Sequence, residues 1–147
     1  MTARIALAAV LLATALAGGC SDDPYADYCS VVEDNQQELS EILGAGGPAA
    51  LLTALPIFTE LEDEAPDDIR DDWKVVTGGL RALEDALQDA GVDPTTYDRD
   101  EPPEGLTDEE KARIDAAAQE LTTATSTQAF AAVEQQARDV CHTPLRL

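Results

Sequence analysis

A stripe of apolar residues with helical spacing runs through the middle of this chain, and it constrains the fold more than any other feature. Its members are separated alternately by four and three positions: Ile69, Trp73, Val76, Leu80, Leu83 and Leu87. Such spacing places these side chains on one face of a helix, which has to be buried against other elements. No stretch of the sequence shows the apolar and polar alternation of a strand. We therefore expect an all-α fold in which this helix supplies a central packing face.

The sequence also marks the ends and one interior feature of this helix. The segment 66–68, Pro-Asp-Asp, predicts its start, because proline suits the first helical position and acids stabilise the positive end of the helix dipole. Gly91 predicts its end, with Val92 packing back on Leu87 as in a Schellman cap. The pair 78–79, Gly-Gly, lowers helix propensity by about 1 kcal/mol per residue and indicates either a close helix contact or a weak point.

Four other segments carry helical patterns: residues 25–43, 48–61, 107–121 and 125–140. Pro56 lies inside the second of them, removes one backbone hydrogen bond and predicts a kink or two short pieces. Thr107 with Glu110, and Thr125 with Gln128, have the spacing of capping boxes and predict the starts of the last two helices.

An apolar segment that ends at a cysteine precedes the helices. Arg4 is followed by an apolar run over residues 5–16 and then by small residues up to Cys20. This order matches a secretory signal, and the run is shorter than the roughly 20 residues that span a bilayer. An ordinary secreted protein with a chance cysteine is the alternative, and Ala17 stands where lipoprotein signals usually have leucine. We expect residues 1–19 to be removed and Cys20 to be lipidated.

Two acyl chains on Cys20 would anchor the protein stably, since each buried methylene contributes roughly 0.8 kcal/mol. Residues 20–24 would then form a tether that reaches little more than ~14 Å. The single helical domain is expected over residues 25–142, with residues 143–147 as a C-terminal tail. The predicted location is the outer face of the cytoplasmic membrane.

The charge of the chain excludes one class of partner. Removing residues 1–19 leaves eight Lys and Arg against 30 Asp and Glu, a formal charge of −22. Nucleic acids are bound by clustered cations that release counterions, so we expect no nucleic-acid partner. An anionic bilayer surface also repels such a domain, so the lipid has to hold it there.

Two cysteines remain once Cys20 carries lipid, namely Cys29 and Cys141. In an oxidising compartment an intramolecular disulfide is the simplest expectation. It would close a loop of more than 100 residues and stabilise the fold by about 4–5 kcal/mol in the chain-entropy model. Neither cysteine belongs to a Cys-x-x-Cys pair, which argues against thiol catalysis.

The expected disulfide also constrains the topology. It joins the start of the first helix to the end of the last, whereas five simple up-and-down passes would place these points at opposite ends of the bundle. One connection must therefore break the alternation. We expect a crossover within residues 92–106, or a non-spanning element around Pro56.

The chain shows no catalytic or cofactor motif. Its only histidine, His142, stands in the C-terminal region and is expected to be solvated. A 12-residue window from Asp98 has acids at three EF-hand positions, but Pro103 occupies the position that requires glycine, so we reject an EF-hand. Weak cation binding remains the single metal hypothesis, and its candidate ligands are Asp98, Asp100, Glu101 and Glu104.

Five aromatic residues are candidates for a pocket or for the core: Tyr28, Phe58, Trp73, Tyr97 and Phe130. Because aromatic residues are scarce in this chain, we expect them to serve as packing area rather than as a binding platform.

Several segments together resemble a group of small, acidic, alanine-rich lipoproteins of actinobacteria. They are the lipobox ending at Cys20, residues 27–29, 55–58 and 65–70, and the ending at residues 134–141. The resemblance covers nearly the whole chain. It implies the lipid anchor and the Cys29–Cys141 pairing, and it implies no catalytic residue, because the group has no assigned activity.

The sequence thus predicts a compact bundle of four to five helices closed by one disulfide. We expect a non-enzymatic, membrane-anchored extracytoplasmic lipoprotein that acts as an interaction or ligand-binding module, without a cofactor and with a protein or small-molecule partner that the sequence does not specify. The alternative is an acidic divalent-cation-binding or structural protein of the cell envelope.

Overall fold

The computed structural model describes residues 23–46 and 49–147, so the predicted signal peptide, Cys20 and the expected helix start at Pro48 lie outside the described residues. Its helices are α1 (Ala26–Ala45), α2 (Ala50–Asp63), α3 (Arg70–Asp89), α4 (Asp108–Glu120) and α5 (Ala124–Val140), and the described residues contain no strand. None of these helices is both long and apolar enough to cross a bilayer. The predicted all-α bundle with one disulfide is confirmed.

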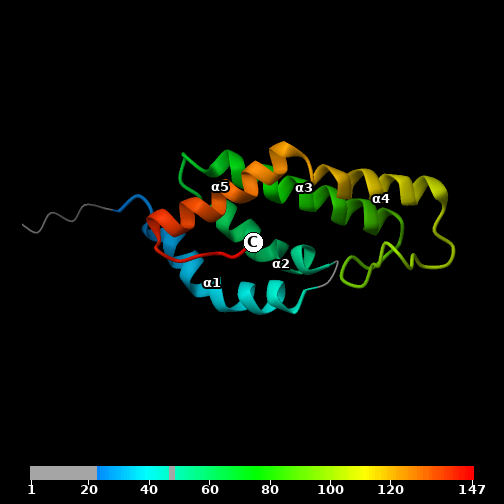
Figure 1. The fold of residues 1–147 in the computed structure, drawn as a ribbon, viewed down its shortest axis with the longest axis horizontal. Helices are drawn as coiled ribbons and strands as arrows, with labels where there is room; N and C mark the ends of the chain where they lie inside the picture. The colour runs from blue at the N-terminus through cyan, green and yellow to red at the C-terminus, as the bar shows by residue number, and fades with distance from the viewer. Residues whose placement is uncertain (1–22, 47–48) are drawn as a thin grey trace, which may run out of the picture.

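The five helices make four passes, because α4 and α5 lie end to end (Figure 1). α1 packs on α2, α2 packs on α3, and α3 packs on both α4 and α5. Only residues 121–123 separate the last two helices, which together run antiparallel to α3. The start of α1 and the end of α5 therefore lie at the same end without any crossover. The predicted crossover within residues 92–106 is wrong, and so is a non-spanning element at Pro56.

α2 continues through Pro56 as one helix, so the expected two short pieces do not form. Pro56 itself is exposed, while its neighbours Leu55 and Ile57 are buried. The Thr59 hydroxyl donates to the Leu55 carbonyl oxygen over 3.0 Å. Burial of apolar side chains on both sides of the proline offsets the lost backbone hydrogen bond to Leu52.

The predicted ends of α3 are half correct. Gly91 adopts a φ of +67°, the Val92 N–H donates to the Leu87 carbonyl over 2.9 Å, and the Gly91 N–H donates to Gln88 over 2.9 Å, which confirms the Schellman cap. The start is wrong by about one turn. The Pro66 carbonyl accepts from the backbone N–H of residues 69 and 70, so residues 66–69 form a turn that leads into the helix.

The two predicted capping boxes also have different outcomes. Thr107 accepts from the Glu110 N–H and the Glu110 carboxylate accepts in return, which confirms the start of α4. The box predicted at Thr125 is wrong, because α5 begins two residues earlier. Its N-cap is Thr123, whose hydroxyl accepts from the Ser126 N–H over 3.3 Å.

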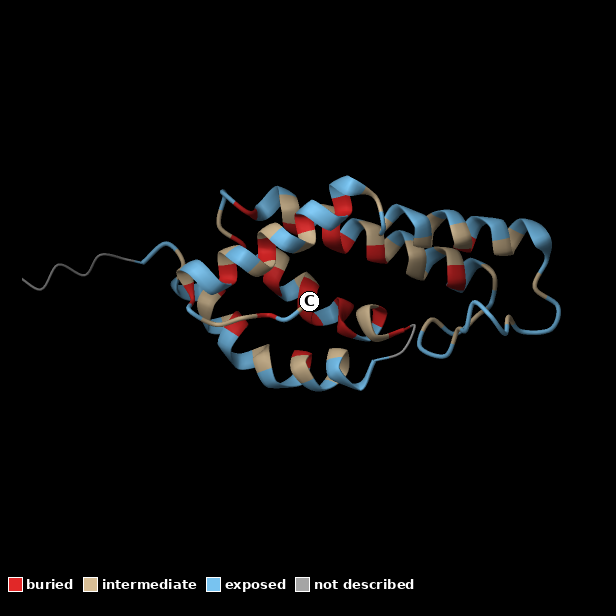
Figure 2. Cartoon of the chain, in the orientation of Figure 1, coloured by how far each residue is buried: buried red, intermediate tan, exposed pale blue. Residues whose placement is uncertain are grey.

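Buried residues line the inward faces of the helices, while α4 contributes only Ile114 to the buried set (Figure 2). The largest buried side chains are Trp73, Tyr28 and Phe58. The Phe58 and Trp73 ring centroids lie 5.9 Å apart, and the Trp73 indole N–H donates to the Tyr28 hydroxyl over 3.2 Å. The expected core role is therefore confirmed for these three aromatics, whereas Tyr97 and Phe130 are only half-buried.

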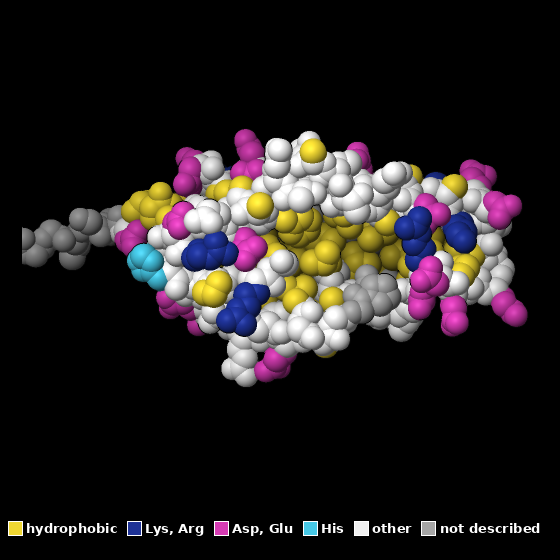
Figure 3. All heavy atoms as spheres, in the orientation of Figure 1, with side chains coloured by type: hydrophobic (Ala, Val, Ile, Leu, Met, Phe, Trp, Pro, Cys, Tyr) yellow, Lys and Arg dark blue, Asp and Glu magenta, His cyan; other side chains and the backbone are white. Residues whose placement is uncertain are grey.

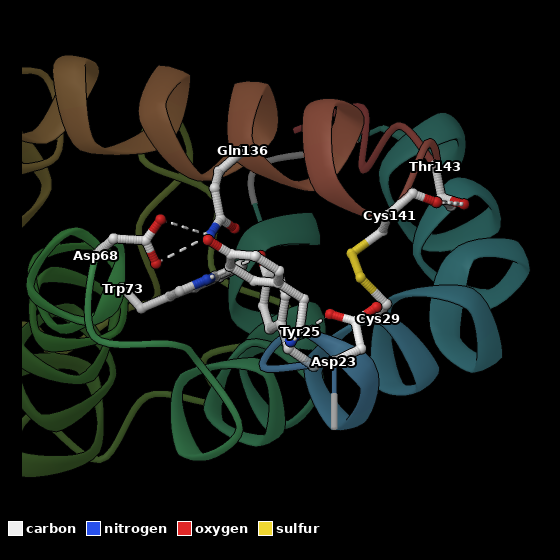
Figure 4. The surroundings of a disulfide bond; sticks show 9 residues. Asp23, Tyr25, Cys29, Asp68, Trp73, Gln136, Cys141 and Thr143 are labelled. Carbon is white, nitrogen blue, oxygen red and sulfur yellow. Dashed lines mark hydrogen bonds between the residues drawn. A yellow bond between two sulfur atoms is a disulfide. The ribbon is translucent and has the colours of Figure 1, made fainter. Parts of the chain in front are cut away.

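The disulfide joins Cys29 on the first turn of α1 to Cys141 at the C-cap of α5, with Cα atoms 5.1 Å apart (Figure 4). At the same end, the Gln136 amide donates to the Asp68 carboxylate over 3.4 Å. The described chain begins at Asp23, beside this end of the bundle. The bond thus ties the first and last passes together.

The C-terminal segment folds back onto the bundle. Leu145 is 1% exposed and belongs to the hydrophobic core, and the Gln36 amide donates to the Pro144 carbonyl over 3.4 Å. His142 is exposed and has a φ of +55° at the turn that starts this segment. Residues 143–147, expected as a tail, therefore contribute to the core of the domain.

Replacing Tyr28 by Phe should change how stability depends on pH. Burial raises the pKa of the Tyr28 hydroxyl to about 12, with the Trp73 hydrogen bond lowering it and the Asp68 charge raising it. The unfolded tyrosine titrates near ~10, so between pH 10 and 12 the folded state holds the proton and the unfolded state loses it. The free energy of unfolding should fall by about 2–3 kcal/mol as the pH rises through this range.

Tyr28→Phe should remove that decrease and cost about 1–3 kcal/mol at neutral pH, because the Trp73 N–H loses its partner. Urea unfolding of both proteins at pH 8 to 12, followed by Trp73 fluorescence, measures both effects. An equally steep decrease in the variant would contradict the assignment to Tyr28.

The two interior glycines of α3 should respond differently to alanine. A Cβ on Gly79 would lie 2.8 Å from Leu121 Cδ2, which confirms the predicted close contact, whereas nothing lies within 4 Å of a Cβ on Gly78. Gly78→Ala should stabilise the protein by about 0.5–1 kcal/mol through helix propensity. Gly79→Ala has to displace Leu121 and should be about 1 kcal/mol less stable than Gly78→Ala. Parallel urea titrations measure the difference, and equal stabilisation would show that Leu121 moves away freely.

Candidate functional site

An apolar cavity lies where the connection between α3 and α4 covers the helices. Its volume is about 160 Å³, and its lining comes from α2, α3, the connection and α4: Leu52, Leu83, Leu87, Pro94, Tyr97, Arg99, Ile114, Asp115 and Ala118. In the same part of the fold, Figure 3 shows hydrophobic side chains gathered in a hollow between the α4–α5 pass and the α1–α2 pair. The lining of this cavity is mainly apolar and also includes the polar groups of Tyr97, Arg99 and Asp115.

Local turns of the connection place its side chains over the cavity. After the Gly91 turn, the Asp93 carboxylate accepts from the Thr95 N–H over 2.9 Å and from the Thr95 hydroxyl over 2.7 Å. These hydrogen bonds hold the pKa of Asp93 below its usual value. The Asp98 carboxylate then accepts from the Asp100 N–H over 2.8 Å. Such side-chain-to-backbone bonds stabilise turns, and the two turns flank Tyr97.

The polar end of the cavity consists of Tyr97, Arg99 and Asp115. The Tyr97 hydroxyl is buried and has no hydrogen-bond partner among the described residues. Arg99 Nε lies 2.9 Å from Asp115 Oδ1, so the two form an ion pair, but the N–H is not directed at that oxygen, which is likewise left without a hydrogen bond. The Tyr97 hydroxyl is thus the buried polar group of this cavity that has neither a hydrogen bond nor an ion-pair partner, and such a group costs about 1–3 kcal/mol.

The electrostatic surroundings of Tyr97 keep its hydroxyl protonated. Burial raises the pKa of Tyr97, the Asp115 charge raises it further, and the Arg99 charge acts in the opposite direction. The hydroxyl is therefore present as a neutral group that can both donate and accept a hydrogen bond.

A larger depression of about 590 Å³, lined by α2, α3 and Thr95 of the connection, is a weaker candidate. Its guanidinium, that of Arg81, lies 3.1 Å from the Glu62 carboxylate and donates to the Thr59 hydroxyl over 3.1 Å. The Thr77 hydroxyl also donates to Glu62 over 2.7 Å. The guanidinium of this depression is therefore already paired within the protein.

The candidate residues from the sequence have different positions. Cys20 lies outside the described residues, and Cys29 and Cys141 form the disulfide. The four acids proposed as weak cation ligands, Asp98, Asp100, Glu101 and Glu104, are all exposed. Within residues 23–46 and 49–147, no three His, Cys, Asp or Glu side chains are placed to hold a metal ion.

The chain matches no protein-family model, no curated protein and no solved structure. The choice of this cavity as the candidate site therefore depends on its own geometry. The sequence made Tyr97 a candidate for a pocket or for the core, with the core role expected, and did not single out Arg99 or Asp115. One signal was present: Asp115 stands three residues before Ala118, on the face of α4 that carries the apolar residues.

Proposed function

We propose that this protein is a lipid-anchored, extracytoplasmic, non-enzymatic module that binds a small ligand in the cavity beneath the α3–α4 connection. The observation that carries the binding role is this cavity, with apolar walls from three helices and, at one end, the buried Tyr97 hydroxyl without a hydrogen-bond partner. Small-molecule sites typically combine predominantly apolar walls with a few convergent polar groups. The signal-like N-terminus ending at Cys20, and the resemblance to small acidic actinobacterial lipoproteins, support the anchor.

The anchor is tested by replacing Cys20 with Ala and following the protein in fractionated cells. The native chain should remain with the membrane fraction and release only with detergent, whereas Cys20→Ala should not. A matched Cys29→Ala variant removes a different cysteine and should still partition with the membrane. Retention of Cys20→Ala in the membrane would refute the lipid anchor.

The binding role is tested by melting the protein with and without saturating toluene. Occupation of the native cavity at a concentration 100 times the Kd would add about 2.7 kcal/mol of stability. Ala118→Leu, which places extra methylenes at the cavity wall, should abolish the shift, while Ala116→Leu on the exposed side of α4 should keep it. If neither toluene nor any other small apolar compound shifts the melting temperature, the binding role is wrong.

The alternative function, an acidic cation-binding or structural envelope protein, is motivated by the formal charge of the chain and by the exposed acids after Tyr97. It predicts that millimolar calcium raises the melting temperature. Asp98→Asn with Asp100→Asn should then remove most of that rise. An unchanged melting temperature in calcium would eliminate this alternative.

A further inference from the structure

We propose that the ligand of this cavity is a neutral single-ring compound with one hydroxyl group, such as a phenol. The inference rests on the proposed binding function and specifies the chemical class of the ligand. It uses three independent properties of the site: the size of the cavity, the hydrogen bonds missing at its polar end, and the charge around it.

The size of the cavity limits the ligand to about one ring. Its volume is about 160 Å³, and most of its walls are leucine, isoleucine and alanine side chains. A closed apolar protein cavity of roughly 150 Å³ takes up benzene, so a cavity of this volume accommodates one ring. Pockets for drug-sized ligands have volumes of about 300–1,000 Å³, so this cavity is too small for such a ligand.

The missing hydrogen bonds specify the polar group on that ring. The Tyr97 hydroxyl can donate, and Asp115 Oδ1 can only accept. A single hydroxyl on the ligand is both acceptor and donor, so it can accept from Tyr97 and donate to Asp115 at once. A hydrocarbon ring would leave the buried Tyr97 hydroxyl without a partner, and sites with such a group discriminate between hydroxylated and unhydroxylated compounds.

The charge around the cavity favours a neutral ligand over a charged one. The surrounding chain is strongly acidic, which disfavours an aromatic carboxylate. Arg99 already lies 2.9 Å from Asp115 and neutralises that carboxylate. An aromatic ammonium that approached Asp115 would therefore be repelled by the positive charge of Arg99. A neutral hydroxyl group adds its hydrogen bonds without separating the Arg99–Asp115 pair.

The test compares the dissociation constants of phenol, toluene, benzoate and benzylamine for the full-length protein by NMR titration. Phenol should bind at least tenfold more tightly than toluene and than either charged ring. Tyr97→Phe keeps the aromatic ring and removes only the hydroxyl, so it should reduce the preference for phenol over toluene to less than threefold. Tyr25→Phe makes the same chemical change on a residue outside the cavity lining and should leave the preference intact.

Each remaining outcome overturns a defined part of the proposal. Equal binding of phenol and toluene would reject the hydroxyl specificity while the binding function stands. Tightest binding of benzylamine or benzoate would show that the cavity selects a charged ring. Phenol binding that survives Ala118→Leu would place the site elsewhere, and absence of binding by every probe would reject the binding function as well.

Discussion

Reducing the Cys29–Cys141 disulfide should lower the free energy of unfolding by about 5 kcal/mol. The two cysteines are 112 positions apart, so the bond closes nearly the whole described chain into one loop. In the chain-entropy model, a closure of this length restricts the unfolded state by about 4.7 kcal/mol at 25 °C. Small domains have total stabilities of about 5–15 kcal/mol, so the reduced protein should be marginally stable.

The measurement is urea unfolding with and without reductant, followed by the fluorescence of Trp73, the only tryptophan in the chain. Cys20→Ser in all samples prevents the third cysteine from pairing with a freed thiol. The variant Cys29→Ser with Cys141→Ser should unfold at a similarly low urea concentration and should not respond to reductant. A loss below about 1 kcal/mol would show that the unfolded chain is already restricted by residual structure.

Local patterns in the sequence predicted the helices well where one interaction dominates. The apolar stripe of α3, the Thr107–Glu110 box and the Gly91 cap each depend on residues within one or two helical turns, and the structure confirms all three. The starts of α3 and α5 were misplaced by a few residues. At both places several residues can cap the helix. At the start of α5, the Thr123 hydroxyl accepts from the Ser126 N–H, and Ser126 is buried, so Thr123 is the N-cap in place of Thr125.

The topology could not be read from such patterns. Five helical segments suggested five passes, and the disulfide then required a crossover or a non-spanning element. Instead, the short junction at residues 121–123 lets α4 and α5 share one pass along α3, with Leu121 against Gly79. This contact joins residues more than 40 positions apart, and neither helix pattern reports it.

The candidate site was less predictable than the fold. Tyr97 lies in a proline-rich connection with no periodicity, and its place over the cavity follows from turns at Asp93 and Asp98. The carboxylate of Asp98, considered in the sequence as a cation ligand, accepts from the Asp100 backbone N–H in one of these turns. The pairing of Arg99 with Asp115 depends on the packing of the connection against α4, which only the three-dimensional structure provides.

Leu145→Ala should be the most destabilising single substitution in the C-terminal segment. Leu145 is 1% exposed and lies within the core, although it is two residues from the end of the chain. Removing a buried leucine side chain typically costs about 2–5 kcal/mol. Leu147→Ala is the matched control, because Leu147 is only half-buried and should lose considerably less. Equal, small losses in the two variants would show that the segment does not stay packed in solution.

Combining Leu145→Ala with reduction of the disulfide tests whether the two features act together. Cys141 holds the start of the returning segment against α1, and Leu145 is buried four residues later. If the disulfide keeps the segment in place, the reduced protein already loses part of the Leu145 packing. The combined loss should then be smaller than the sum of the separate losses by about 0.5–3 kcal/mol, the range seen for coupled sites. Strict additivity would mean that the segment docks on the core independently of the covalent bond.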